Sequence, residues 1–153
     1  MTDLLVKLYS LLPPAASPVG IDVRRAFAAE KQLVLDWIKT RFGQGWASEC
    51  EAAFARLPVA CFLAVRDREM LGFACYDATA RGFFGPTGVA ESERNHGIGA
   101  ALLLAALHDM AAQGYAYAII GGVDAVEFYR KHVGATEIAD SAPGFYRGML
   151  KPE

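Results

Sequence analysis

A chain of 153 residues has the length of one domain and is long enough to bury a substantial core. Hydrophobic residues make up 54% of it and charged residues 21%, which excludes a disordered segment. Fifteen basic and seventeen acidic residues give a net charge of −2 without a basic stripe, so neither nucleic acid nor an anionic membrane is expected as a partner.

Apolar runs and cysteines predict a cytoplasmic protein without a metal site. The longest apolar run, Ile98 to Leu107, is shorter than the about 18 residues of a membrane span. The N-terminal residues lack the basic region of a signal peptide. Cys50, Cys61 and Cys75 follow no metal-binding spacing, so we expect reduced, buried thiols, with a catalytic Cys75 as the alternative.

Alternation of apolar residues predicts the strands, and their three- and four-residue spacing predicts the helices. In chain order the predicted elements are strands at 4–9 and 19–23, helices at 28–42 and 48–56, strands at 59–66, 70–78 and 83–89, a helix at 97–113, a strand at 115–120, a helix at 124–132 and a strand at 145–150. Residues 44–46 are expected to link the first two helices. Asp124 and Glu127 resemble a capping box, and Gly134 stands where a helix ends.

This order of elements predicts one α/β domain over residues 1–153. Hairpin strands followed by a crossover helix imply a mixed, mostly antiparallel sheet with helices on both faces. Residues 1–18 form an N-terminal extension with an extra strand and a linker, and residues 19–153 form the core.

The segment that carries chemistry is RNHGIGA, at residues 94–100, which opens the third helix. Gly97 and Gly99 allow positive φ angles and close approach of a ligand. The first N–H groups of a helix lack partners within it, and together with the helix dipole they favour a bound anion. Arg94 adds a cation. A phosphate or diphosphate group is therefore the expected ligand.

Two other nucleotide motifs fit this segment poorly. A Walker A loop requires Lys followed by Ser or Thr after its last glycine, where this sequence has Ala100 and Ala101. A dinucleotide fingerprint requires a third small residue at the position of Leu102 and an acid within a βαβ unit, whereas Asp124 follows the next strand. A glycine turn that caps a core helix, without any ligand, remains the plain alternative.

Three segments resemble the GNAT superfamily of N-acetyltransferases. RNHGIG is similar to its Arg/Gln-x-x-Gly-x-Gly/Ala signature, AVEFYRKHVGA to its A-x-x-F-Y-x-K-x-G segment, and VRRAFAAEKQLVLDWI to its first strand and helix. The resemblance covers residues 19 to 153. It implies a GNAT-like acyl-CoA acyltransferase fold, acetyl-CoA as co-substrate, and a primary amine, expected to be a small molecule, as acceptor.

The resemblance also implies roles for individual residues. The coenzyme A diphosphate would lie on the backbone amides of Asn95, His96, Gly97, Ile98, Gly99 and Ala100, in the loop that Arg94 opens. Backbone groups of Gly88 and Val89 would pair with the pantetheine arm, in the manner of an added strand. Tyr129 occupies the position of a general acid, with core packing as its alternative role.

The remaining site residues are less strongly marked. Asp77 is a candidate base at a strand end, where a solvated carboxylate is the alternative. Gln44, Trp46 and Phe83, together with Phe84, are candidates for acceptor binding. The family often has Asn where this chain has Gly122, so a side-chain contact to coenzyme A or to the acceptor is missing from the pattern.

Two alternatives to an enzyme follow from the same residues. A domain of this fold could hold acyl-CoA as a sensor without turnover. The extra strand at residues 4–9 could pair with a second subunit, giving a homodimer, or cover a sheet edge, although pairing within its own chain is the simpler expectation.

Overall fold

The computed structural model describes residues 1–14 and 16–153 of the chain. Its α-helices are α1 (Lys31–Phe42), α2 (Gln44–Phe54), α3 (Ile98–Ala112) and α4 (Val126–Val133). Its strands are β1 (Thr2–Lys7), β2 (Asp22–Arg25), β3 (Cys61–Arg66), β4 (Glu69–Tyr76), β5 (Phe83–Val89), β6 (Tyr117–Val123) and β7 (Thr136–Glu137). None of the helices in these residues is long and apolar enough to cross a membrane.

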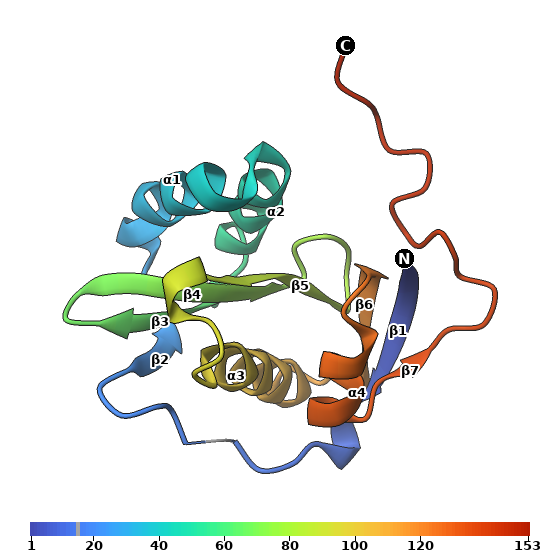
Figure 1. Ribbon diagram of the computed structural model, residues 1–153, viewed down its shortest axis with the longest axis horizontal. Coiled ribbons are helices and arrows are strands. Elements are labelled where there is room, and N and C mark those ends of the chain that lie inside the picture. The colour runs from blue at the N-terminus through green and yellow to red at the C-terminus, as the bar shows by residue number, and fades with distance from the viewer. Residues whose placement is uncertain (15) are drawn as a thin grey trace.

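The seven strands form one mixed sheet in the order β2-β3-β4-β5-β6-β1-β7. Neighbours pair antiparallel except β5 and β6, which are parallel because α3 crosses over between them. Helices α1 and α2 cover one face of the sheet, and α3 covers the other (Figure 1). The predicted mixed α/β fold is confirmed.

The parallel strands β5 and β6 separate after a short contact. They pair only at Phe83 with Ile119 and at Phe84 with Ile120. The next residue, Gly85, has a φ of +115°, and Pro86 has no N–H to donate, so β5 cannot continue the ladder to β6. Beyond this point β5 pairs with β4 alone, up to Val89. The result is a fork between β5 and β6 that opens toward α4.

The N-terminal strand β1 lies inside the sheet, between β6 and β7. It pairs antiparallel with β6 along most of its length and with β7 at Leu4 and Leu5. The side chains of Leu4 and Val6 are fully buried. This strand therefore pairs within its own chain, as the simpler expectation had it. The prediction of a homodimer is not tested by this arrangement.

Core packing fixes the position of helix α3 and of its first turn. Leu102, Leu103 and Leu107 are at most 1% exposed and pack against the sheet. Burial of such a side chain contributes about 1.5–3 kcal/mol. A helix fixed this firmly keeps the loop before it, and the N–H groups of its first turn, in one position.

The predicted strand at 145–150 is wrong. These residues form turns, and the last strand is the two-residue β7. Gly144 and Gly148 have φ angles of +103° and +79°, which bend the chain. The N–H of Phe145 donates to the Asp3 carboxylate, 2.9 Å away, instead of to a neighbouring strand. The C-terminal segment thus packs across the sheet end without joining it.

Other element boundaries also differ from prediction, since β2 is Asp22–Arg25 and not 19–23, and β6 is Tyr117–Val123 and not 115–120. Residues 44–46 are the first turn of α2 and not a linker, because the single residue Gly43, at φ +98°, is enough to separate α1 from α2. Helix α4 begins at Val126, and Asp124 makes no side-chain capping bond. The Asp124 carboxylate instead lies 3.5 Å from the N-terminal amine. Gly134 does end α4, as predicted, at φ +63°.

Candidate active site

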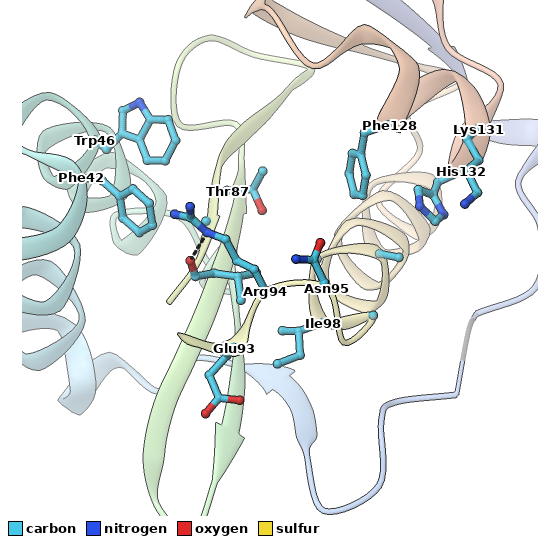
Figure 2. A pocket seen from close by; sticks show the side chains of 15 residues that line it. Phe42, Trp46, Thr87, Glu93, Arg94, Asn95, Ile98, Phe128, Lys131 and His132 are labelled. Atoms are coloured by element: carbon cyan, nitrogen blue, oxygen red, sulfur yellow. Dashed lines mark hydrogen bonds between the residues drawn. The ribbon is translucent and has the colours of Figure 1, made fainter. Parts of the chain in front are cut away.

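A cavity lies where the end of β5, the loop before α3 and helix α4 meet (Figure 2). We call it the α3 cavity; its volume is about 680 Å³. Its lining residues are Phe42, Trp46, Thr87, Gly88, Val89, Glu93, Arg94, Asn95, Gly97, Ile98, Gly99, Ala100, Phe128, Lys131 and His132. Eight of the nine residues predicted to bind cofactor are among them, and His96 is not.

The first turn of α3 supplies main-chain donors to this cavity. Gly97, at φ +83°, turns the chain into the helix, and its carbonyl accepts the bond from the N–H of Ala101 at 3.1 Å. The N–H groups of Ile98, Gly99 and Ala100 come before that bond, so the helix gives them no acceptor. Donors at the positive end of a helix form a site for an anion.

The two glycines of the loop play different parts. Only Gly97 has a positive φ, whereas Gly99 is helical. A Cβ on Gly99 would lie 3.7 Å from the ring of Phe128 and 3.8 Å from the side chain of Val89, which are ordinary contact distances. The backbone geometry of the turn therefore requires glycine at position 97 and not at position 99.

Basic side chains make the α3 cavity electrostatically positive. Arg94 and Lys131 line it from opposite sides, together with His132 (Figure 2). The one carboxylate in the lining, that of Glu93, forms an ion pair with Arg66 at 2.5 Å, which lowers its pKa below the usual range. With that carboxylate neutralised by Arg66, the field inside favours an anionic ligand.

The edge of β5 that faces the fork keeps one main-chain donor for a ligand. The N–H of Ala90 donates to Leu71 of β4 at 2.8 Å, so alternation along the strand directs the N–H of Val89 to the opposite edge. The carbonyl of Val89 is already taken, because the Nε of Arg94 donates to it at 3.2 Å (Figure 2). This contact also ties Arg94 to the strand end.

A second cavity, which we call the fork cavity, continues from the α3 cavity into the space between β5 and β6. Its volume is about 320 Å³, and it shares Trp46 and Thr87 with the α3 cavity. It is lined by Trp46, Glu49, Thr79, Phe84, Gly85, Pro86, Thr87, Ile120, Gly121, Gly122, Val123, Asp124, Ala125, Tyr129 and Tyr146. The two cavities therefore meet beside Thr87, where ligands bound in each would touch.

Tyr129, predicted as a general acid, lines the fork cavity from α4. Its side chain is only 9% exposed and its ring packs edge-on against Phe84 and Phe128. Burial raises the pKa of Tyr129 to about 12, so the hydroxyl keeps its proton at neutral pH. Within the described residues that hydroxyl has no hydrogen-bond partner, which leaves its proton available to a ligand.

Asp77, predicted as a base, lies away from both cavities. It lines a separate pocket with Tyr76 and Tyr115. One carboxylate oxygen accepts the Gly82 N–H at 2.7 Å, and the other accepts the Tyr115 hydroxyl at 2.7 Å. Because both oxygens hold the turn after β4, the geometry gives Asp77 a structural role and does not support it as the base.

Of the three predicted acceptor-binding residues, one lines the cavities and two do not. Trp46 lines both cavities and stacks on Phe42, with ring centroids 5.0 Å apart. Gln44 lines neither cavity and bonds to Ser48 on its own helix at 3.3 Å. Phe83 packs against Phe145, 4.7 Å between centroids, outside the fork cavity. Its neighbour Phe84 lines the cavity instead.

The fork cavity is also lined by residues that the sequence did not predict as site residues, namely Glu49, Thr87 and Tyr146. Glu49 follows Trp46 by three positions on a helix, so their spacing could have placed it on the same face. Thr87 lies on the β5 strand that was expected to meet the ligand. Tyr146 gave no sequence signal, because only the tertiary contacts of the C-terminal segment bring it to the cavity.

The three cysteines meet at one point of the core, between α2 and the β3–β4 hairpin. All three are free and buried, as predicted, and their sulfur atoms lie within 4.8 Å of one another. Burial and the neighbouring sulfurs raise the pKa of the Cys75 thiol well above its usual range. A neutral thiol outside both cavities is not the nucleophile that the alternative reading of Cys75 required.

Comparison with known proteins agrees with this architecture. Among solved structures, the chain superimposes on a GCN5-related N-acetyltransferase from Sphaerobacter thermophilus, with a TM-score of 0.74 and 20% identity over 90% of this chain and 48% of that one. It also matches a glucosamine N-acetyltransferase region in a fungal multi-domain β-N-acetylglucosaminidase, with a TM-score of 0.70 and 15% identity over 90% and 19% of the two chains. A tandem GNAT protein from the clavulanic acid biosynthesis pathway matches with a TM-score of 0.59 and 16% identity, over 89% of this chain and 49% of that one.

The chain thus spans about half, or less, of the length of these structures, and at such identities they show a shared fold. No protein of curated function matches the sequence. The profile of the Acetyltransferase (GNAT) family matches residues 31–135. This range includes α1, strand β5, which lines both cavities, the anion-binding turn and α4. On that match over more than half of its length, the chain belongs to the GNAT family of acetyltransferases.

Proposed function

We propose that the protein is an acetyl-CoA-dependent N-acetyltransferase that acts on a primary amine. The observation that carries the proposal is the set of main-chain donors at Ile98, Gly99 and Ala100, flanked by Arg94 and Lys131 in one cavity. This arrangement suits a diphosphate, and the family to which the chain belongs typically transfers acetyl groups from acetyl-CoA.

The remainder of the α3 cavity suits the rest of coenzyme A. Val89, Ile98 and Phe128 give it apolar walls beside the pantetheine arm, and the free N–H of Val89 offers a strand-like hydrogen bond. A neighbouring cavity of about 600 Å³ shares Phe42 and Arg94 with it and adds Arg41, a second guanidinium for a further phosphate.

In the proposed reaction the acetyl group lies beside Thr87, where the cavities meet. The acceptor nitrogen bonds to the acetyl carbon and the carbon–sulfur bond breaks. The hydroxyl of Tyr129 donates its proton to the departing sulfur and is reprotonated by the proton that the new amide nitrogen loses. Orientation of both reactants across this junction supplies much of the rate enhancement.

The experiment is calorimetry with acetyl-CoA, followed by thiol release across a panel of primary amines. We expect binding that weakens in Arg94→Ala, because a charge-assisted contact to phosphate is lost. We also expect thiol release that depends on the amine. Binding without thiol release for any amine would favour a non-catalytic acyl-CoA sensor, and absence of binding would overturn the proposal.

A further inference from the structure

The two joined cavities differ in the sign of their charge. The α3 cavity has Arg94, Lys131 and His132 in its lining. The fork cavity has two carboxylates, those of Glu49 and Asp124, and no lysine, arginine or histidine. Asp124 stands at the rim, with its side chain 78% exposed and 3.5 Å from the N-terminal amine. Glu49 is half-buried and is therefore the carboxylate that defines the interior.

Glu49 has no basic partner within 4.0 Å in the part of the chain that the structure describes. The nearby acid Glu51, two residues further along α2, is paired with Lys31 at 3.0 Å. A half-buried carboxylate in an apolar cavity is costly unless a counter-charge reaches it. The fork cavity therefore presents a carboxylate that no basic side chain of the described residues neutralises.

Tyr146 fixes the position of the Glu49 carboxylate. Its hydroxyl donates to Oε1 of Glu49 at 2.6 Å and lies 3.2 Å from the Thr79 hydroxyl. Burial, and then the bond to Glu49, raises the pKa of Tyr146 to about 12, so it donates throughout the physiological range. The second oxygen, Oε2, has no protein donor among the described residues and can accept a proton donor from a ligand.

The place of Tyr146 depends on Gly122. Its ring lies over that glycine so closely that a Cβ there would be 2.9 Å from the ring, and the φ of Gly122 is +63°. A side chain at position 122 would therefore displace the tyrosine that orients Glu49.

We infer that the fork cavity binds a small primary amine in its ammonium form, held by Glu49, and that Glu49 is the base that deprotonates it. This inference rests on the proposed function. Trp46, Phe84 and Tyr129 line the same cavity, and aromatic rings attract an ammonium group. A cavity of about 320 Å³ limits the acceptor to a small molecule.

The protons balance in this scheme. The ammonium gives one proton to the free oxygen of Glu49, and the neutral nitrogen attacks the acetyl carbon. The second proton leaves the nitrogen as the amide forms and reaches the sulfur through the hydroxyl of Tyr129. The proton on Glu49 is then released to solvent. The titratable groups that face this event are Glu49, Asp124, Tyr129 and Tyr146.

The test compares Glu49→Gln with Glu51→Gln, a matched change on the same helix that leaves the cavity intact. Gln at position 49 keeps an oxygen for Tyr146, so the fold is preserved. The probes are isobutylamine, 2-phenylethylamine and 1,4-diaminobutane, each against the corresponding alcohol. We expect Glu49→Gln to lower kcat/KM for amines by about 10²-fold or more, with the acetyl-CoA Kd unchanged. Glu51→Gln should match the wild type.

A second readout separates binding from proton transfer. Calorimetry should show that the amines bind and their alcohols do not, and that Glu49→Gln weakens this binding. Loss of the base should lower kcat as well as raise KM for the amine in Glu49→Gln, whereas loss of the cation site alone would raise KM only. Identical behaviour of Glu49→Gln and Glu51→Gln, or equal binding of alcohols and amines, would overturn the cation site while leaving acetyl-CoA binding intact. Ammonium binding at Glu49 without acetyl-CoA binding would instead overturn the proposed transferase.

Discussion

At the scale of single residues, burial decides which side chains can give or take a proton. Tyr129 and Tyr146 face the same cavity and both keep their protons at neutral pH, but they differ in what they bind. The hydroxyl of Tyr146 is committed to Glu49, whereas that of Tyr129 has no protein partner in the described chain. A free, neutral phenol beside an apolar junction suits donation to a leaving group.

Replacement of Tyr129 by Phe tests this role. We expect turnover to fall by about 10²-fold, because a general acid contributes at least that much. The Kd for acetyl-CoA should change by less than about twofold, since the ring and its packing remain. Steady-state kinetics and calorimetry measure the two quantities.

The matched control is Tyr117→Phe, which removes a hydroxyl bonded only to Tyr9 on the surface. It should leave both quantities unchanged. Wild-type turnover in Tyr129→Phe would remove this hydroxyl from the mechanism.

Buried tyrosines also predict how stability depends on pH. The pKa values of Tyr76, Tyr129 and Tyr146 are raised to about 12 from an ordinary 10.0, in each case chiefly by burial. The folded state therefore holds these protons more tightly than the unfolded state, and their contribution is full below pH 10 and lost as pH rises toward 12.

We expect the urea midpoint of unfolding to fall between pH 10 and 12. The absorbance of tyrosinate should rise at a higher pH than it does for an ordinary tyrosine. A midpoint that stays constant to pH 12 would contradict the raised pKa values.

At the scale of elements, the turn into α3 shows which features a local sequence pattern can predict. The motif at residues 94–100 predicted an anion-binding helix start, and its residues line the α3 cavity apart from His96. Local rules suffice there, because the glycines, the loop and the helix are adjacent in the chain. They failed at residues 145–150, where the partner of the Phe145 N–H is Asp3, more than a hundred residues away.

The same limit explains the acceptor side of the site. Trp46 is expected at the acceptor site because it lies between the first two predicted helices. Glu49 shares a helix face with it, but no sequence pattern indicates that Tyr146 bonds to Glu49 at 2.6 Å. Asp77 was chosen for its place at a strand end, and its engagement by Tyr115 and Gly82 could not be read from spacing. Contacts between distant segments are absent from periodicity and motif patterns.

The two glycines of the α3 turn give a matched pair of substitutions. Gly97→Ala should destabilise the fold by about 1 kcal/mol, because a left-handed φ of +83° strains any residue with a Cβ. A shift of the turn that relieves this strain moves the N–H donors, so acetyl-CoA affinity should fall by up to about tenfold.

Gly99→Ala is the control for the backbone, since its Cβ would meet only ordinary contacts at 3.7 and 3.8 Å. Chemical denaturation should find it no less stable than the wild type. Equal losses in the two variants would show that φ is not the reason for the glycine at position 97.

At the scale of the whole molecule, the N-terminal strand and the segment at residues 141–146 meet beside the wall of the fork cavity. Oδ1 of Asp3 accepts the N–H groups of Gly122 and Phe145, each at 2.9 Å, and so joins the start of the chain to β6 and to the C-terminal segment. The main-chain N–H of Asp3 donates to Ser141 at 3.0 Å. These contacts hold Tyr146 in reach of Glu49.

Asp3→Ala should therefore cost about 1–2 kcal/mol of stability, because two main-chain donors, one part-buried and one exposed, lose a charged acceptor. Hydrogen exchange should quicken over residues 138–147, and KM for the amine should rise while the acetyl-CoA Kd stays constant.

Asp3→Asn is the control, because its amide oxygen can accept both bonds. If Asp3→Ala left exchange in the C-terminal segment unchanged, the clamp would have no part in placing Tyr146.

The position of β1 has a consequence for how the protein is made. Strand β1 pairs with β6 and β7, which leave the ribosome more than a hundred residues after it. Until then the side chains of Leu4 and Val6, which are buried in the folded protein, have no partner strand. Strands β2 to β5 can pair with one another while β1 stays unpaired. Closing so long a loop slows folding. Nascent chains halted before residue 117 should consequently recruit chaperones through their first residues and release them once β6 emerges.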